Sequence, residues 1–239
     1  MLSASTDKPV LVIQHEAAAH AGTLLETFVN HGLAVDVRQL HTGSGLPQRH
    51  ELDDHAALIV LGGSMNVDQA PEFGFIAEEQ DLLRAAVGAD IPVLGICLGG
   101  QQLAAAVGGS VYPRAEPEVG WLPVEIVADD RLFAGIGSPF MALEWHAQSF
   151  AVPPAAVVLA VRGDDPGVQA FRYGPRAWGV QFHVEVDEAM LAHWIRRDNK
   201  GLRQRDPELL SSLHESMPHI AAESRQLCRR IVSNLVAAL

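Results

Sequence analysis

Cysteine is scarce in this chain: Cys97 and Cys228 are the only two among 239 residues, and they lie far apart in the sequence. Small disulfide-held domains carry many more cysteines, and structural zinc sites need Cys and His at close spacing. The sequence also lacks a Walker loop and a dinucleotide-binding fingerprint. We therefore expect no disulfide framework, no metal and no cofactor.

Long apolar runs and positive charge are scarce as well. No run approaches the ~20 apolar residues that cross a bilayer, and residues 1–9 hold no apolar signal core. The chain has 17 Lys and Arg against 29 Asp and Glu, for a net charge of −12. A phosphate backbone attracts clustered positive charge. We therefore expect neither nucleic acid nor membrane as a partner, and a reducing, cytoplasmic location.

The first half of the sequence alternates buried strands with helices. Hydrophobic residues make up 48% of the chain and charged residues 19%, as in globular domains. Short apolar runs followed by helical patterns predict parallel strands that are covered on both faces. The strands are expected at 9–13, 33–37, 57–61 and 92–96, and the helices at 23–30, 75–87 and 99–107.

After residue 110 the pattern changes to short strands separated by Gly and Pro turns, at 120–127, 140–143, 157–161, 168–171 and 177–182, before a helix at 187–197. These strands predict antiparallel additions. The fold expected is a doubly wound, mixed α/β sheet in three layers, flavodoxin- or Rossmann-like. Residues 1–197 would form the catalytic domain. Residues 198–239, with helices near 208–215 and 220–239, would form a C-terminal helical extension packed on or beside it.

The strongest local signal is Gly95-Ile96-Cys97-Leu98-Gly99, where a buried strand meets a helix. This is a nucleophile-elbow pattern with cysteine in place of serine. A sharp turn lifts the nucleophile out of the strand, and the positions two before and two after it must be small because backbone passes close by. The helix N-terminus favours a thiolate and offers N–H groups to an oxyanion. A buried structural cysteine is the alternative.

A thiolate hydrolase needs a base, and His183 in Gln181-Phe-His-Val-Glu185 is the best candidate. It follows a predicted strand, and Glu185, two residues on, would share its face and orient the imidazole if the strand continued. His146, after another strand, is the rival base. The remaining candidates lack such a context and are expected at the surface or at caps: His15, His20, His41 and His193.

Together these segments resemble the class I, triad-type glutamine amidotransferase family, especially stand-alone members similar to the amidotransferase half of GMP synthase. The similar stretches are Gly62-Gly-Ser-Met-Asn-Val67, Pro92 to Gln101, Glu118-Val-Gly-Trp-Leu-Pro-Val124, Glu144-Trp-His-Ala-Gln-Ser-Phe150 and Gly179-Val-Gln-Phe-His-Val-Glu185. The resemblance covers roughly residues 9–197. On the residues alone, Gly62-Gly63 is as compatible with an ordinary tight turn as with an oxyanion loop.

The resemblance implies that Cys97 attacks the side-chain amide of glutamine, that His183 moves the proton and that Glu185 holds His183. The N–H groups of Leu98 and Gly63 would bind the oxyanion. Gln101 would contact the amino-acid end of the substrate, and the backbone of Trp145, His146, Ala147 and Gln148 would complete the clamp.

Three segments depart from the family pattern: Ser64 and Val184 replace the usual prolines, and His146-Ala-Gln-Ser149 replaces His-Gly-Asp-Thr. These leave the substrate open. The chain would hydrolyse glutamine and release ammonia to a separate synthetase or other acceptor, or it would hydrolyse γ-glutamyl peptides with the same triad. Leu98 after the cysteine disfavours the related stress and chaperone proteins, which usually place His there. An intact triad disfavours a catalytically silent scaffold.

Overall fold

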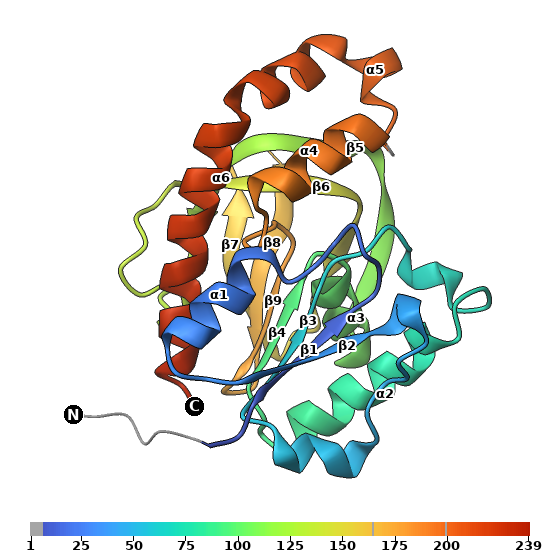
Figure 1. The fold of residues 1–239 in the computed structure, drawn as a ribbon, viewed down its shortest axis with the longest axis vertical. Helices are drawn as coiled ribbons and strands as arrows, with labels where there is room; N and C mark the ends of the chain where they lie inside the picture. Colours follow the sequence, from blue (N-terminus) through green and yellow to red (C-terminus); the bar gives the residue numbers. More distant parts are fainter. Residues whose placement is uncertain (1–6, 164, 199) are drawn as a thin grey trace.

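The structure is a computed structural model, and it describes residues 7–163, 165–198 and 200–239. One mixed sheet runs through the molecule with helices on both faces (Figure 1). The strand order is β2-β1-β3-β4-β9-β8-β7-β5-β6. The three-layer α/β arrangement predicted from the sequence is confirmed.

Half of the sheet is parallel and deeply buried. Strands β1, β3, β4 and β9 are buried along their whole length, which explains why they show as continuous apolar runs. Strand β2 lies at the sheet edge and is half-exposed. The bounds are β1 Val10–Gln14, β2 Val35–Gln39, β3 Ala57–Val60, β4 Val93–Ile96 and β9 Ala177–Val180.

The other half is antiparallel, as expected, but its four strands are longer than predicted, β5 and β6 most of all. Strand β5 begins at Ser110 and not at residue 120, and β6 runs on to Ala151. Prolines in β5 argued against a strand there. The register with β6 shifts between Pro113 and Glu118, a stretch that includes Pro117, whereas Pro123 pairs with Met141 in the regular ladder. The bounds are β5 Ser110–Ile126, β6 Phe140–Ala151, β7 Ala156–Arg162 and β8 Asp165–Tyr173.

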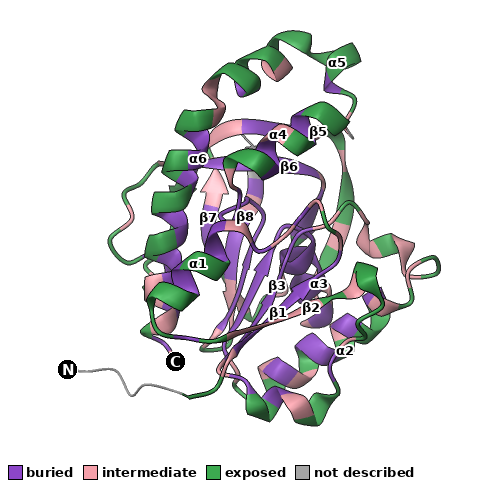
Figure 2. Cartoon of the chain, viewed as in Figure 1, coloured by how far each residue is buried: buried purple, intermediate pink, exposed green. Residues whose placement is uncertain are grey.

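The helices form two layers, each with its own apolar core. Helices α1 (Gly22–Asn30) and α6 (Pro207–Val236) cover one face, and α2 (Phe75–Gly88) and α3 (Leu98–Ala106) cover the other. Figure 2 shows the buried side of each helix turned toward the sheet. Helices α4 (Glu188–Arg197) and α5 (Leu202–Arg205) pack with the start of α6. Short 3-10 helices span Leu40–Thr42, Arg49–Asp54, Val67–Gln69 and Arg131–Phe133.

Helix α6 is one helix where the sequence predicted two. It continues through Pro218, and Figure 1 shows it bending between its ends, as expected of a helix that contains proline. Its second half places Cys228, Ile231 and Val232 in the core shared with α1 and the sheet. The extension is thus built into a helical layer, and the domain boundary at residue 197 stays a prediction. No helix among the described residues is long and apolar enough to cross a bilayer.

Helix α3 lies so close to the sheet that we predict a severe cost for Gly99→Ala. A Cβ at Gly99 would lie 2.1 Å from the carbonyl oxygen of Val60, and backbone cannot move aside as a side chain can. We expect a loss of about 3 kcal/mol in unfolding free energy, measured by urea denaturation. Gly88→Ala is the matched control, since a Cβ there has no neighbour within 4 Å. A Gly99→Ala protein as stable as the control would contradict the close approach.

Candidate active site

The candidate site is built around Cys97 at the turn from β4 into α3. Cys97 has φ +51°, a conformation that non-glycine residues rarely adopt, and its side chain is buried. A Cβ atom added at Gly95 would lie 2.4 Å from the carbonyl oxygen of Gly99. One added at Gly100 would lie 2.6 Å from the carbonyl oxygen of Val180. The strained elbow and the small flanking residues expected from the sequence are both present.

His183 and Glu185 lie next to this turn and to each other. Nδ1 of His183 is 2.7 Å from Oε1 of Glu185, and both side chains are buried. The strand does not continue to them, since β9 ends at Val180. Instead the backbone N–H of His183 donates to the carbonyl of Leu143 on β6. The N–H of Thr23, in the first turn of α1, donates to the carbonyl of Glu185 and fixes it from behind.

The thiol and the imidazole shift each other's pKa. Burial by itself would raise the pKa of Cys97, but the charge of His183 and a hydrogen bond to it outweigh burial, so the pKa is lowered. Burial would lower the pKa of His183, but the charges of Glu185 and Cys97 hold it well above its usual range. The lowered pKa of Cys97 and the raised pKa of His183 together favour a thiolate–imidazolium pair.

Trp194 packs on the imidazole, and Trp145 packs on Trp194. The ring of Trp194 on α4 meets that of His183 edge-on at 4.8 Å, and it lies 5.7 Å from the ring of Trp145 on β6. The indole N–H of Trp194 donates to the carbonyl of Ala18 at 2.6 Å. This bond ties α4 to the loop after β1, so Trp194 is held in place from two elements.

The Gly62-Gly63 turn after β3 is held from behind by His15. The Nδ1 of His15 lies 3.0 Å from the carbonyl oxygen of Gly62, and its Nε2 lies 2.9 Å from Glu79. The prediction that His15 is a surface or capping residue is wrong, because the Glu79 carboxylate raises its pKa despite full burial and makes a buried imidazolium tolerable. Since the Gly62–Gly63 peptide is trans, the Gly63 N–H points away from His15.

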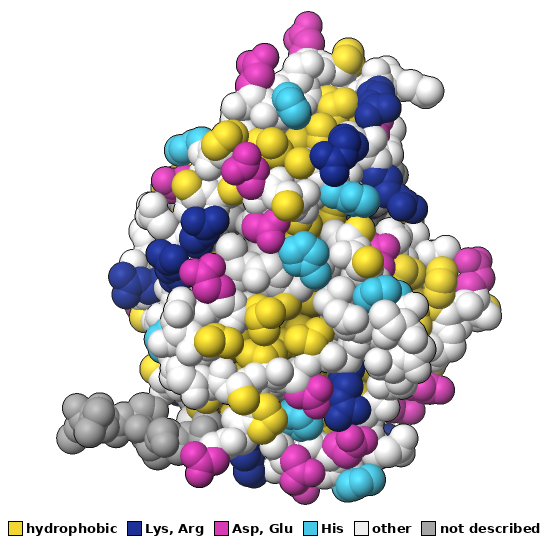
Figure 3. All heavy atoms as spheres, in the orientation of Figure 1, with side chains coloured by type: hydrophobic (Ala, Val, Ile, Leu, Met, Phe, Trp, Pro, Cys, Tyr) yellow, Lys and Arg dark blue, Asp and Glu magenta, His cyan; other side chains and the backbone are white. Residues whose placement is uncertain are grey.

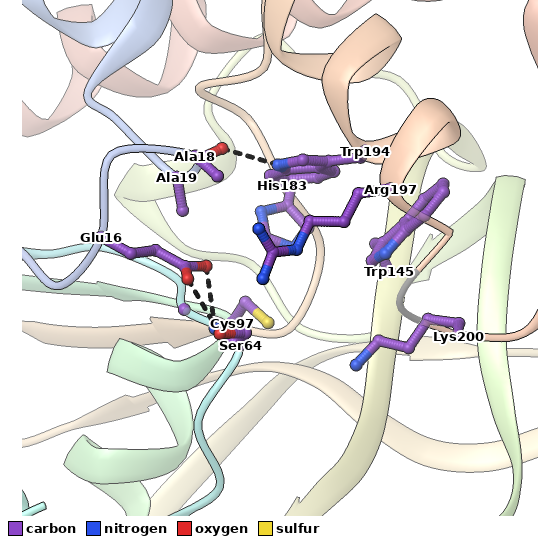
Figure 4. A pocket seen from close by; sticks show the side chains of 11 residues that line it. Glu16, Ala18, Ala19, Ser64, Cys97, Trp145, His183, Trp194, Arg197 and Lys200 are labelled. Carbon is purple, nitrogen blue, oxygen red and sulfur yellow. Dashed lines mark hydrogen bonds between the residues drawn. The ribbon is translucent and has the colours of Figure 1, made fainter.

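A pocket opens over these groups, and Figure 4 shows side chains reaching it from several elements. We call it the Cys97 pocket. Four of the predicted site residues line it: Gly63, Cys97, Trp145 and His183. Ser64, which the sequence analysis named as a departure from the family pattern, also lines it. The sequence had not singled out the other lining residues: Glu16, Ala18, Ala19, Trp194, Arg197 and Lys200.

Glu16 explains one departure from the family pattern. Its carboxylate accepts the backbone N–H of Ser64 at 3.0 Å and the Ser64 hydroxyl at 2.8 Å. Proline, usual at position 64, has no N–H to donate. The serine thus lets the loop after β1 clasp the loop after β3.

The other predicted substrate-binding residues are not among the residues that line the pocket. The Gln101 side chain donates to the carbonyl of Gln148 at 2.9 Å, and the Gln148 side chain contacts Val67 and Asp68. Leu98, His146 and Ala147 also do not line the pocket. Gln101 thus ties α3 to β6, and Gln148 ties β6 to the 3-10 helix Val67–Gln69.

His146 cannot serve as a base in this arrangement, because both ring nitrogens face acceptors. Nδ1 is 2.8 Å from the carbonyl of Gln148, and Nε2 lies 2.9 Å and 3.0 Å from Glu118 and Glu144. The Nε2 contacts are ion pairs and not well-aligned hydrogen bonds. Burial lowers the pKa of His146, but the two carboxylates outweigh burial and raise it to about 9. A metal ion could be held by Glu118, Glu144 and His146 only by displacing the Nε2 proton.

Comparison with known proteins decides the family. The model of the class-I glutamine amidotransferase family matches residues 13–197. The chain belongs to this family. Within it, the chain is 31% identical over 192 residues to the glutamine amidotransferase-like protein YfeJ of Salmonella typhimurium, covering 76% of this chain and 79% of that one. It is 34% identical over 98 residues to a glutamine-hydrolyzing GMP synthase subunit of Methanosarcina acetivorans, covering 41% of this chain and 52% of that one.

The amidotransferase fold extends over nearly the whole chain. A glutamine amidotransferase of Thermotoga maritima superposes with a TM-score of 0.86 at 27% identity, covering 97% of this chain and 99% of its own. The remaining 3% is too little to hold residues 198–239. The C-terminal helices therefore have a counterpart in that stand-alone amidotransferase, beyond the part that the family model matches.

We predict that the two cysteines of this amidotransferase differ in their rate of alkylation. Cys97 should react at neutral pH with iodoacetamide, whereas burial raises the pKa of Cys228 to about 11 and keeps it unreactive. In His183→Gln the apparent pKa of Cys97 should rise, because the cation that favours its thiolate is gone. Peptide mass spectrometry over a pH series measures both. An unchanged profile in His183→Gln would rule out the thiolate–imidazolium pair.

We predict that His146 keeps both ring protons up to about pH 9. Its folded pKa lies above the usual 6.5, so its contribution to stability is fully present below pH 6.5 and is lost as the pH rises through about 9. The loss should be on the order of 3 kcal/mol. Nitrogen-15 spectra of the ring report the protons, and denaturation at several pH values reports the stability. A ring that loses a proton near pH 6.5 would contradict the ion pairs.

Proposed function

We propose that this amidotransferase cleaves the γ-amide of glutamine through a covalent thioester on Cys97. The observation that carries the proposal is the order Cys97, His183, Glu185: a strained thiol whose pKa is lowered by the charge of His183, the imidazole that lines the same pocket, and a buried carboxylate behind the imidazole. This is the arrangement that thiol-dependent acyl transfer needs. Family membership supports the same chemistry.

The reaction would proceed in two halves. The Cys97 sulfur attacks the amide carbon, and His183 gives its proton to the departing ammonia, which leaves a γ-glutamyl thioester. His183 then removes a proton from water, the hydroxide attacks the thioester carbon, and the thiol leaves with glutamate as product. Glu185 keeps the Nδ1 proton of His183 in place, so that Nε2 handles the transferred proton.

The oxyanion would be held by two backbone N–H groups. Leu98 is the first residue of α3, where N–H groups have no partner within the helix. Gly63 lines the pocket, and its N–H points away from His15 because His15 holds the preceding carbonyl. Removing one donor of this kind typically costs a factor of about 100 or more in rate.

Ammonia would go to a separate protein. The Methanosarcina relative is by its name one subunit of a glutamine-hydrolyzing GMP synthase, which supports a partner synthetase chain for this protein. A protein partner fits the surface better than nucleic acid does: the net charge is −12, and basic and acidic side chains intermingle on the face shown in Figure 3. Two free cysteines support a reducing compartment such as the cytoplasm.

The second candidate is hydrolysis of γ-glutamyl peptides by the same three residues. The Cys97 pocket continues past the thiol to Arg197 and Lys200, which leaves polar wall for a leaving group larger than ammonia. The two functions differ in the leaving amine and not in the attack.

A hydrolysis panel tests both candidates. Glutamine and γ-glutamyl dipeptides are offered to the purified protein, and glutamate and ammonia are measured. Cys97→Ser should lose on the order of 1000-fold or more in activity while it unfolds at the parent's temperature, because serine is not ionised at neutral pH. Cys228→Ser is the matched control and should keep parental activity.

The same panel assigns the base. His183→Ala should lose on the order of 1000-fold, and His146→Ala much less, because His146 has no free lone pair. A severe loss in His146→Ala beside a mild one in His183→Ala would reassign the base. Activity retained in Cys97→Ser would refute the thioester.

A further inference from the structure

The Cys97 pocket of this acidic protein holds two cations. Arg197 and Lys200 line it, and Figure 4 shows both side chains reaching toward the space above Cys97. Among the residues described, neither makes a hydrogen bond or an ion pair. With 29 acidic residues available to 17 basic ones, two unpaired cations at one pocket call for an explanation.

Both cations are positioned by the fold. Arg197 lies three residues after Trp194 on α4, so the two share a helix face, and Trp194 is fixed by its bond to Ala18. Lys200 lies in the turn after α4. Asp198 stabilises that turn by accepting the backbone N–H groups of Leu202 and Arg203 at 2.6 Å and 2.9 Å.

The acid within the pocket does not neutralise them. The carboxylate of Glu16 already accepts two hydrogen bonds from Ser64. Burial lowers the pKa of Lys200, and the charges of Cys97 and Glu16 offset burial only in part. A partly desolvated ammonium without a partner gains most from a ligand that brings a negative charge.

We propose that Arg197 and Lys200 form a carboxylate-recognition pair, so that the Cys97 pocket selects substrates with a carboxylate near the scissile bond. The inference rests on the proposed function for the reaction itself, and it adds the substrate class: γ-glutamyl compounds that carry an anionic group. That carboxylate is either the α-carboxylate of the glutamyl part or the carboxylate of a leaving amino acid. Both present the same chemistry to a guanidinium and an ammonium.

Alkylation of Cys97 tests the pair without any substrate. Thiolate sulfur displaces iodide from iodoacetate, which carries a carboxylate, and from iodoacetamide, which is neutral. The ratio of the two rates cancels any change in the thiolate fraction. We expect the parent's iodoacetate-to-iodoacetamide ratio to exceed that of free glutathione by about tenfold, the range of one charged hydrogen bond. Arg197→Gln and Lys200→Gln should each lower the ratio.

Arg196→Gln is the matched control. Arg196 precedes Arg197 on the same helix and is exposed like Arg197, but it does not line the Cys97 pocket. It should keep the parent's ratio. Equal ratios in the parent and in both pocket variants would overturn the proposal, whether or not the protein hydrolyses glutamine.

Substrate pairs identify the carboxylate. Glutamine is compared with its α-amide, and γ-glutamylglycine with γ-glutamylglycinamide. The pocket variants should raise KM about 10- to 100-fold for the carboxylate member of one pair and leave the amide member unchanged. An effect in the first pair assigns the α-carboxylate, and one in the second assigns the leaving group.

Equal loss on both members of each pair would mean a structural role and would refute recognition. If the parent hydrolyses none of the four while its alkylation ratio is high, the proposed function fails and the recognition pair stands.

Discussion

The candidate active site depends on one steric constraint, the contact of α3 with the sheet at the Cys97 turn. Backbone of β3, β4, β9 and α3 meets there at distances that allow no side chain at Gly95, Gly99 or Gly100. The contact forces Cys97 to a positive φ, places its thiol at the N-terminus of α3 and sets it beside the carboxyl ends of β3 and β9. Every other group of the site is placed relative to that thiol. Packing, and not a catalytic side chain, is therefore what makes the arrangement possible.

Electrostatics then separates two histidines that look alike in sequence. His183 has one carboxylate on Nδ1, and its other nitrogen is left for Cys97. His146 faces a carbonyl and two carboxylates, and it is held as a cation. That cation still acts on the site, because its charge helps to lower the pKa of Cys97. One imidazole is therefore suited to moving protons, and the other supplies a fixed positive charge.

The sequence predicts those parts of the site that follow from local chain geometry. Cys97 with its glycines is such a pattern, and so is the run of buried parallel strands. The pairing of His183 with Glu185 was predicted on the assumption that both lie on one continuing strand. That assumption is wrong, because β9 ends at Val180, and a bridge to Leu143 on β6 positions the histidine instead. Trp194, Arg197 and Lys200 were missed because only tertiary packing brings α4 over the thiol. Glu16 could have been predicted as a site residue, because it follows β1 as Gly63 follows β3, and the carboxyl ends of parallel strands meet at one edge of the sheet. His15 was misplaced because its partner Glu79 is 64 residues away.

The pocket has two parts of different origin. The thiol, imidazole and carboxylate come from the segments that follow the parallel strands β4 and β9, within residues 13–197, the part that the family model matches. The cationic wall comes from the last residue of that part and from Lys200 just beyond it. Helix α6 packs against both α1 and α4, so the extension braces the helix that carries Trp194 and Arg197. The same helix also reaches the imidazole, because Trp194 meets the ring of His183. Changes in the extension can therefore act through α4 on the cationic wall and on His183 together, so the proposed recognition and the proposed proton transfer depend on one supporting helix.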